Sequence, residues 1–264
     1  MSIDLALSGL KRDQKIISIA KLNPIFCREK DLIKQVVEKM LTTDYRRMAI
    51  LSSKGKISGI ITTMDILDAF LRKQSFDEAI STIMSREVIT CNADDNVYFL
   101  LQKFKISRRG GFPVLDDGKL VGMVSERDIV KRFASVPFGI AVSEVMTKRP
   151  FFIKPSLSIF DATKALVNTH YRRLPIVEGN KLVGLITTID LLKQIQKYNF
   201  DSSNLHTPVD DISIKQIYTV LKNQDVSDAI SVMVQHDVGG VPVIDSNNML
   251  DGMITERDIL EEIV

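Results

Sequence analysis

The chain has 264 residues, of which 45% are hydrophobic and 26% charged, so it can bury one large or two ordinary cores and need not be disordered. The 35 Lys and Arg residues nearly balance the 33 Asp and Glu residues, and a net charge of +2 gives no broad field that would attract nucleic acid or an anionic membrane. Because no apolar stretch is long enough to span a bilayer and the start, MSIDLALSGLKRDQK, is too charged for a signal peptide, we expect a cytoplasmic protein.

The same predicted elements follow one another several times along the chain. A short extended segment comes first, as at 88–91 and 151–153, and a helix follows, as at 95–104, where the apolar positions 97, 100, 101 and 104 share one stripe. Helical counterparts begin near Asp31, Ser158 and Asp225. Two strands around a polar turn come next, as at 112–115 and 120–124, and a second helix ends each unit.

A short motif marks the end of the second strand in each unit. It consists of Gly, two apolar residues, Thr or Ser, two further residues and Asp, and it occupies 59–65, 122–128, 184–190 and 252–258. Four nearly evenly spaced copies indicate internal repetition. We therefore predict an α/β chain of four β-α-β-β-α units, each of which leaves apolar surface that a single copy cannot cover, so pairing is expected.

The predicted unit boundaries are 14–75, 76–136, 137–199 and 205–264. The first and second units are expected to form one module, and the third and fourth another. The break between the modules is placed near 134–139, where Pro and Gly interrupt the helical pattern. A second irregular stretch, 199–208, accounts for the longer last interval.

With these motifs, residues 14–264 resemble the cystathionine-β-synthase (CBS) domain family. The family's apolar-Pro-apolar strand is present at 112–114, 174–176 and 241–243, whereas 48–50 reads Met-Ala-Ile and makes the first unit the least regular. The resemblance implies CBS repeats paired into two Bateman modules with up to four clefts that take adenine nucleotides. Segments 151–162 and 170–175 are similar to the γ subunits of AMP-activated protein kinase, which favours AMP, ADP or ATP as the ligand.

The repeated hydroxyl and carboxylate have two compatible interpretations. A Thr or Ser followed three residues later by Asp can cap a helix, and the same helix start offers N–H donors to a phosphate while the Asp can accept from ribose hydroxyls. The ligand interpretation requires that the carboxylates not be folded back onto amides or covered. The predicted ribose and phosphate residues of the motifs are Thr62, Asp65, Ser125, Arg127, Asp128, Thr187, Asp190, Thr255, Arg257 and Asp258.

Arginines before the second strand are further phosphate candidates, because a guanidinium there could reach an anion at the helix start. Pairs stand at 46–47, 108–109 and 172–173, whereas the fourth unit has Val238-Gly239-Gly240. Since the second and fourth motifs carry an Arg and the first and third do not, we expect clefts of unequal affinity. His170 is a phosphate candidate and, like His236, also a candidate helix C-cap. The named candidates are Arg47, Arg109, Arg172, Arg173 and His170.

Adenine needs an apolar slot, for which the opening segments and the strand prolines are candidates, although each could equally be core. The candidate residues are Ile25, Phe26, Val88, Ile89, Phe151, Phe152, Ile217, Tyr218, Pro113, Pro175 and Pro242.

The sequence lacks the common catalytic and cofactor motifs, including the phosphate loop, the dinucleotide fingerprint, the zinc-protease pair and the nucleophile elbow. Cys27 and Cys91 have neither disulfide-scaffold nor metal spacing and are expected to be buried. We therefore expect a non-catalytic regulatory protein without a metal or catalytic cofactor, which binds an adenine nucleotide and signals to an effector protein or through a homodimer. The alternatives are a ligand-independent interaction scaffold, a nucleic-acid-binding protein, which the near-neutral charge disfavours, and, least supported, a nucleotide enzyme.

Overall fold

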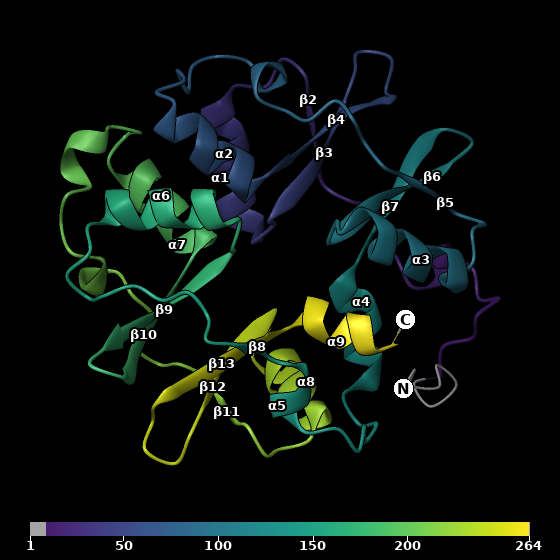
Figure 1. The fold of residues 1–264 in the computed structure, drawn as a ribbon. Helices are drawn as coiled ribbons and strands as arrows, with labels where there is room; N and C mark the ends of the chain where they lie inside the picture. Colours follow the sequence, from purple (N-terminus) through teal and green to yellow (C-terminus); the bar gives the residue numbers. More distant parts are fainter. Residues whose placement is uncertain (1–8, 264) are drawn as a thin grey trace.

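The chain forms four α/β units around a common centre, and going round that centre the first unit is followed by the second, fourth and third (Figure 1). The computed structural model describes residues 9–263. Each unit keeps the predicted order of elements, except that the third opens with an isolated bridge between Ile153 and Ile176 instead of a strand. Within the described residues no helix is long and apolar enough to cross a membrane.

The bounds of the elements repeat from unit to unit. The first unit contains β2 (Phe26–Arg28), α1 (Ile33–Thr43), β3 (Arg47–Leu51), β4 (Ile57–Thr62) and α2 (Thr63–Leu71). The second contains β5 (Cys91–Asn92), α3 (Val97–Ser107), β6 (Gly111–Asp116), β7 (Lys119–Ser125), α4 (Glu126–Val130) and the 3-10 turn η4 (Lys131–Phe133). The third contains α6 (Ile159–Thr169), β9 (Arg173–Glu178), β10 (Lys181–Thr187) and α7 (Thr188–Lys197). The fourth contains β11 (Val220–Leu221), α8 (Val226–Gln235), β12 (Gly240–Ile244), β13 (Leu250–Thr255) and α9 (Glu256–Ile263).

The opening strands are shorter than the sequence predicts. Of the expected segment 88–91 only Cys91 belongs to a strand, and Phe151 and Phe152 precede the bridge at Ile153 without pairing. A strand of two or three residues bonded on one side provides few ladder hydrogen bonds, so these segments are extended without regular pairing. Cys27 and Cys91 are buried, as expected.

The segment that precedes each unit lies on the other unit of the same module. β1 (Lys21–Leu22) comes before the first unit but pairs antiparallel with β7 of the second, where Lys21 lies opposite Met123. In the same way, β8 (Thr147–Lys148) comes before the third unit and pairs with β13 of the fourth. The reciprocal bridges are Ile60–Ser85 and Leu185–Ile214. These exchanged segments join the first unit to the second and the third to the fourth, giving two Bateman modules.

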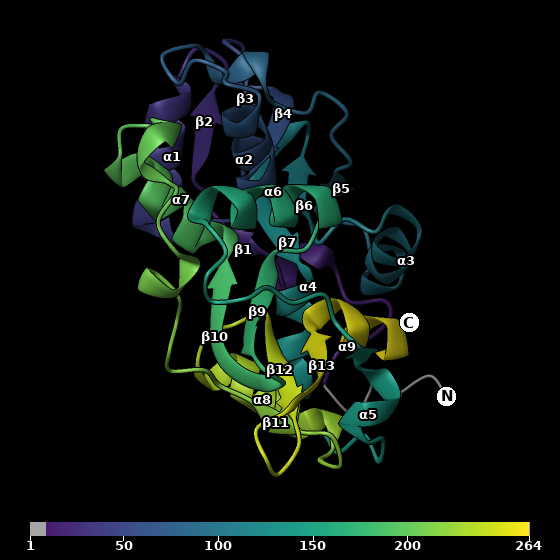
Figure 2. The same ribbon diagram turned by 60° about the vertical axis from the view of Figure 1, so that its left-hand side comes forward.

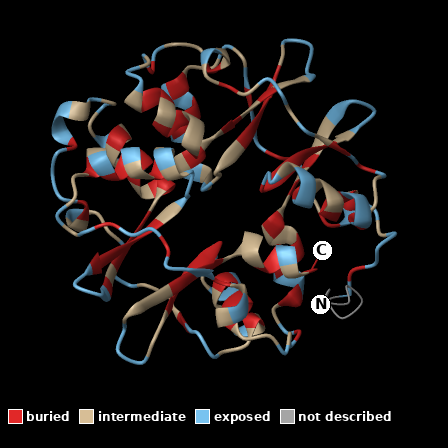
Figure 3. Cartoon of the chain, viewed as in Figure 1, coloured by how far each residue is buried: buried red, intermediate tan, exposed pale blue. Residues whose placement is uncertain are grey.

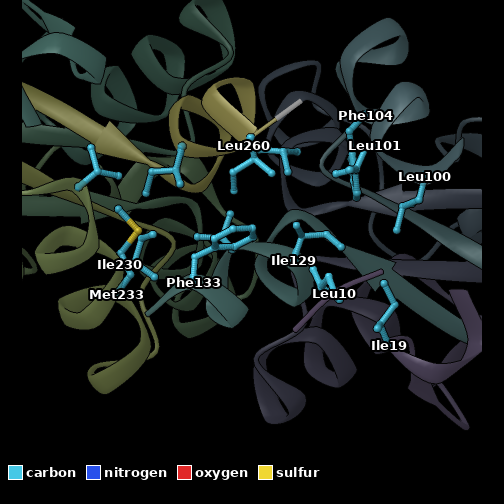
Figure 4. Packing of buried hydrophobic residues seen from close by; sticks show 14 of the residues in the cluster. Leu10, Ile19, Leu100, Leu101, Phe104, Ile129, Phe133, Ile230, Met233 and Leu260 are labelled. Atoms are coloured by element: carbon cyan, nitrogen blue, oxygen red, sulfur yellow. The ribbon is translucent and has the colours of Figure 1, made fainter. Parts of the chain in front are cut away.

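The hydrophobic cores, in contrast, cross from one module to the other. One cluster of buried side chains combines the first and third units, where α1 and α2 contact α6 and α7. The other cluster combines the second and fourth units, where Ile129 and Phe133 lie beside Leu260 and Ile230 (Figure 4). Buried residues occur in helices and strands of all four units (Figure 3). Each module therefore completes its cores with the helices of the other.

The two helical interfaces use different polar contacts at equivalent positions. Between the first and third units, the Thr63 hydroxyl donates to the Thr188 hydroxyl over 3.0 Å, and both residues are buried. Between the second and fourth units, the equivalent Glu126 and Glu256 accept from the arginines Arg257 and Arg127 of the opposite unit. The neutral pair and the ionic pairs thus occupy corresponding places on opposite sides of the ring.

Replacing Thr63 by Val should lower the free energy of unfolding by about 1–2 kcal/mol, because the buried Thr188 hydroxyl would lose its partner. The combined variant Thr63→Val/Thr188→Val should recover most of that loss, since neither hydroxyl then remains buried and unpaired. Urea unfolding of the three proteins measures both effects. Equal stability of the single and double variants would show that this hydrogen bond does not contribute.

Candidate ligand-binding clefts

Two clefts have corresponding linings, one beside the motif of the second unit and one beside the motif of the fourth, and residues of both modules line each of them. Cleft A has a volume of about 360 Å³ and lies between the turn before β3 and the start of α4. It receives the motif residues Ser125 and Asp128. Its remaining lining residues are Lys21, Thr43, Asp44, Tyr45, Arg46, Arg47, Gly110, Met123, Val124, Arg127, Lys131, Arg172, Asp237 and Glu256.

Cleft B is the counterpart in the other module and has a volume of about 290 Å³. It lies between the turn before β9 and the start of α9, and it receives the motif residues Thr255 and Arg257. Its remaining lining residues are Arg108, Glu126, Thr147, Pro150, Phe151, His170, Tyr171, Arg172, Arg173, Pro175, Gly239, Met253 and Glu256. Both volumes are near the lower end of those usual for small-molecule pockets.

The two clefts are assembled from corresponding parts. We call the first and third units odd and the second and fourth units even. Each cleft combines three parts: the motif of an even unit, the arginine-containing turn before the second strand of an odd unit, and the exchanged strand that pairs beside the motif. In cleft A the exchanged strand supplies Lys21 opposite Met123, and in cleft B it supplies Thr147 opposite Met253. The two clefts therefore share one layout, while the exchange of lysine for threonine makes them chemically unequal.

All four motif carboxylates complete helix caps. In each motif one oxygen, Oδ2, accepts from the backbone N–H and the hydroxyl of the residue three positions earlier, over 2.6–2.9 Å. The capping interpretation is therefore confirmed. All four Asp residues remain partly exposed, and the second oxygen of Asp128 pairs with Lys131 over 2.8 Å. All four carboxylates are thus folded back onto backbone amides, so the condition stated for the ligand interpretation is not met, and only the second oxygen of each carboxylate is left outside the cap.

The motifs of the first and third units do not reach these clefts. Thr62, Asp65, Thr187 and Asp190 line neither of them, and neither does Asp258. At the position of Glu126 and Glu256 the motifs of the first and third units carry Thr63 and Thr188. These two threonines hydrogen-bond to each other in the helical interface. The even motifs are thus the ones placed beside the converging arginines.

The arginine pairs of the first and third units contact the glycine pairs of the second and fourth units. Arg47 and Arg173 occupy the positions at which the even units have Gly111 and Gly240, and each arginine donates to the carbonyl of that glycine in its own module. A methyl group built on Gly110 would lie 2.8 Å from a guanidinium nitrogen of Arg172. The even units therefore need glycine where the odd units need arginine, because the guanidinium fills the space of a side chain.

Arg108 and Arg109 do not correspond to the other pairs, which corrects the sequence interpretation. Arg108 aligns with Asp44 and His170, since all three end the first helix of their units with φ between 52° and 57°. Arg109 is exposed and lines neither cleft. The signal that could have revealed the shift is the Gly-Gly that follows Arg109, because it matches Gly239-Gly240.

The buried Glu126 and the partly buried Glu256 lie among these arginines. Glu126 is 2% exposed and accepts from Nε of Arg257, while Glu256 accepts from Nε of Arg127 over 2.7 Å. Burial raises the pKa of Glu126, against the opposing effect of Arg257. Desolvation alone would lower the pKa of Arg127, but Glu256 and Asp237 together raise it. Glu126 and Glu256 thus hold arginines of both modules in place and neutralise part of their positive charge.

Burial and neighbouring arginines lower the pKa values of Arg47 and Arg173 in the first and third units. Burial and, to a lesser extent, the neighbouring Arg172 lower the pKa of Arg47 to about 10. Burial lowers the pKa of Arg173 to about 9, with Arg46 acting in the same direction. In addition, Nη2 of Arg127, which lines cleft A, is buried without a hydrogen-bond partner among the described residues. An anion entering from the cleft would supply both the charge and the acceptor.

Most of the predicted adenine walls lie elsewhere. Phe151 and Pro175 line cleft B, whereas Ile25, Phe26, Val88, Ile89, Phe152 and Ile217 line neither cleft. Tyr218 stacks on His236 with ring centroids 3.5 Å apart, and Pro113 and Pro242 are buried in strands and line neither cleft. The apolar lining that sequence reasoning missed includes Met123 and Tyr45 in cleft A and Met253, Pro150 and Tyr171 in cleft B.

The predicted histidines have helix-end positions. His170 is the left-handed C-cap of α6 and also lines cleft B, while His236 is the C-cap of α8. The cap interpretation is confirmed for both, and the phosphate role of His170 stays a prediction.

Comparisons with known proteins agree with this architecture. The CBS domain profile matches residues 16–72, 80–135, 142–197 and 209–264. Protein MJ1225 of Methanocaldococcus jannaschii is 25% identical over 255 residues, with 87% of this chain and 91% of that protein covered. Its crystal structure, described as a candidate archaeal homologue of γ-AMPK, covers 95% of this chain with a TM-score of 0.87. An uncharacterised 33.4 kDa protein from Thermofilum pendens is 27% identical, with 81% of this chain and 79% of that protein covered.

Proposed function

Because the chain belongs to the CBS domain family, whose unit it contains four times, we propose that it is a regulatory protein that binds adenine nucleotides in clefts A and B. The observation that carries this proposal is the unpaired, buried Nη2 of Arg127 in cleft A, beside arginines contributed by both modules. Phosphate oxygens are the acceptors that such a cluster of guanidinium groups prefers.

The ligand would lie with its phosphates toward the centre of the ring and its sugar beside the motif. In cleft A, Ser125 and the second oxygen of Asp128, which otherwise pairs with Lys131, would contact the sugar, and Arg46, Arg127 and Arg172 would surround the phosphates. The base would rest against apolar side chains at the outer part of each cleft, such as Met253 and Phe151 in cleft B. A ligand held this way touches both units of a module and an arginine of the other module. Occupancy would therefore favour one relative arrangement of the modules, which an effector protein can recognise.

A matched pair of variants separates ligand binding from capping. Asp128→Ala and Asp65→Ala each remove a helix cap, so each should lower the free energy of unfolding by about 1 kcal/mol. Asp128 lines cleft A and Asp65 lines neither cleft, so Asp128→Ala alone should weaken nucleotide binding, by about tenfold. Isothermal titration with AMP, ADP, ATP and S-adenosylmethionine measures the affinities, and urea unfolding measures the stabilities.

The ligand-independent scaffold is the alternative that a specific observation favours, because every motif carboxylate completes a cap. In that case none of the four compounds would produce heat or raise the melting temperature of the intact protein. A nucleotide at a hundred times its Kd should stabilise the fold by about 2.7 kcal/mol, which a thermal scan detects readily. Stabilisation by none of them would remove the nucleotide proposal and leave the fold assignment intact.

A further inference from the structure

The outward side of α3 carries large apolar residues that the core does not use. Tyr98 is 43% exposed, Phe99 58% and Ile106 82%, and the rings of Tyr98 and Phe99 meet edge to face at 5.9 Å. The opposite side of the helix, with Leu100 and Phe104, fills the core (Figure 4). α3 lies at the outer edge of the molecule in both ribbon views (Figures 1 and 2). Its apolar outer side is therefore turned away from the rest of residues 9–263.

The other three units provide an internal comparison for this helix. At the position of Phe99 they carry Gln35, Asp161 and Asp228, and at the position of Ile106 they carry Thr42, Asn168 and Gln235. The same scaffold thus folds with polar residues at both places. Phe99 and Ile106 are not required by the β-α-β-β-α unit, and an exposed apolar surface of this kind is typical of an interaction site.

A groove lies between α3 and α9; Tyr98, Phe99 and Ile106 do not line it, and it adjoins them through Lys105, the neighbour of Ile106 in the chain. It has a volume of about 240 Å³ and is lined by Phe104, Lys105, Arg108, Arg257, Leu260 and Glu261. The corresponding helices of the other interface, α1 and α7, pack against each other. Where α3 and α9 face each other, a concave site remains between them, with an apolar floor of Phe104 and Leu260 and walls that carry three basic residues and the acidic Glu261.

The charge of α3 and the two residues after it is one-sided, whereas α9 contributes the acidic Glu261 to the groove. From Val97 to Arg109 the chain carries Lys103, Lys105, Arg108 and Arg109 and no acidic residue. Lys105, Arg108 and Arg109 are exposed and follow the apolar residues along the helix. A partner that matches this surface must combine apolar side chains with acidic ones.

We propose that the α3 surface, defined by Tyr98, Phe99, Lys105, Ile106 and the groove beside them, docks an acidic amphipathic helix of an effector protein. Apolar side chains of that helix would cover Phe99 and Ile106, and its carboxylates would meet Lys105, Arg108 and Arg109. The groove favours a peptide over a lipid surface, because a helix can insert a side chain between α3 and α9 whereas a bilayer presents a flat face.

The α3 surface also touches cleft B, which connects it with the proposed nucleotide site. Arg108 and Arg257 line both the groove and cleft B, and Arg257 donates to the carbonyl of Arg108 over 2.8 Å. An anion in cleft B that draws either guanidinium inward changes the walls of the groove. This connection rests on the proposed function, whereas docking itself does not.

Docking is tested with the full chain and three synthetic peptides of about 18 residues, long enough to form a helix. The peptides share a leucine stripe and carry Glu, Gln or Lys on the remaining face. Fluorescence anisotropy should show binding of the Glu peptide and at least about tenfold weaker binding of the Lys peptide. Comparable affinity for all three, or no binding of the Glu peptide, would overturn the proposal.

Variants locate the binding surface without disturbing the fold. Phe99→Gln and Ile106→Thr install the residues of the first unit, and together they should weaken binding of the Glu peptide by about tenfold or more. Leu221→Gln, which removes an exposed apolar residue of β11, should leave the affinity unchanged. Equal losses in the α3 variants and Leu221→Gln would place the peptide elsewhere.

Two further arms distinguish other occupants. Flotation with phosphatidylserine vesicles and sedimentation velocity of the protein alone are carried out with wild type and the Phe99→Gln/Ile106→Thr variant. Vesicle binding or self-association that the variant abolishes, without peptide binding, would assign the surface to a membrane or a second copy and overturn the proposal. If the Glu peptide binds but adding AMP or ATP leaves its affinity unchanged, docking stands and the connection through Arg108 and Arg257 fails.

Discussion

Replacing Glu126 by Ala should lower the free energy of unfolding by about 3–5 kcal/mol, the usual cost of removing one partner from a buried ion pair. Glu126 is 2% exposed and accepts from Arg257. Burial raises its pKa, and the charges of Arg257, Arg172 and Arg47 oppose that rise. Without the carboxylate, guanidinium groups of three units would face one another with less compensation. Urea or thermal unfolding of the variant measures the loss.

A double variant tests whether the loss comes from unpaired charge. Glu126→Thr/Arg257→Met installs the residues that the first unit has at these positions, Thr63 and Met64. It should be more stable than Glu126→Thr alone, because the partner charge is removed as well. Recovery should be incomplete, since Arg47 and Arg172 remain. A double variant less stable than the single one would assign the effect to packing instead of charge.

The repeating architecture could be predicted from the sequence because its signals are local. The motif that begins at Gly59 and recurs three times fixed the number of units, and helical periodicity at positions 97–104 located α3. The helix caps follow from the spacing between Ser or Thr and Asp, which depends on neighbouring backbone alone. These features need no knowledge of how distant segments meet.

The clefts depend on contacts that local signals do not encode. Lys21 belongs to cleft A because β1 crosses to the second unit, and Arg172 reaches it from the opposite module. Nothing near Glu126 in the chain indicates that its partner is Arg257. The complementary use of Arg47 and Gly111 becomes visible only when the units are aligned and their two-by-two arrangement is known. For the same reason, the sequence does not show that the motifs of the second and fourth units line the clefts whereas those of the first and third units do not.

Arg172→Ala should weaken nucleotide binding at both clefts, by about 10- to 100-fold where the guanidinium meets a phosphate. Arg172 lines cleft A and cleft B, and its side chain extends from the turn before β9 to Gly110 of the second unit. The larger loss is expected at cleft A, because the guanidinium lies on that side. Isothermal titration with ATP and AMP follows both binding phases.

Arg109→Ala is the matched control, since it removes an arginine that the sequence also nominated but that lines neither cleft. Its affinities should equal those of wild type. Arg172→Lys should recover part of the binding at each cleft, because it keeps the charge but not the two-pronged contact with phosphate. Equal losses in Arg172→Ala and Arg109→Ala would mean that general surface charge attracts the nucleotide, and that the centre of the ring is not where its phosphates bind.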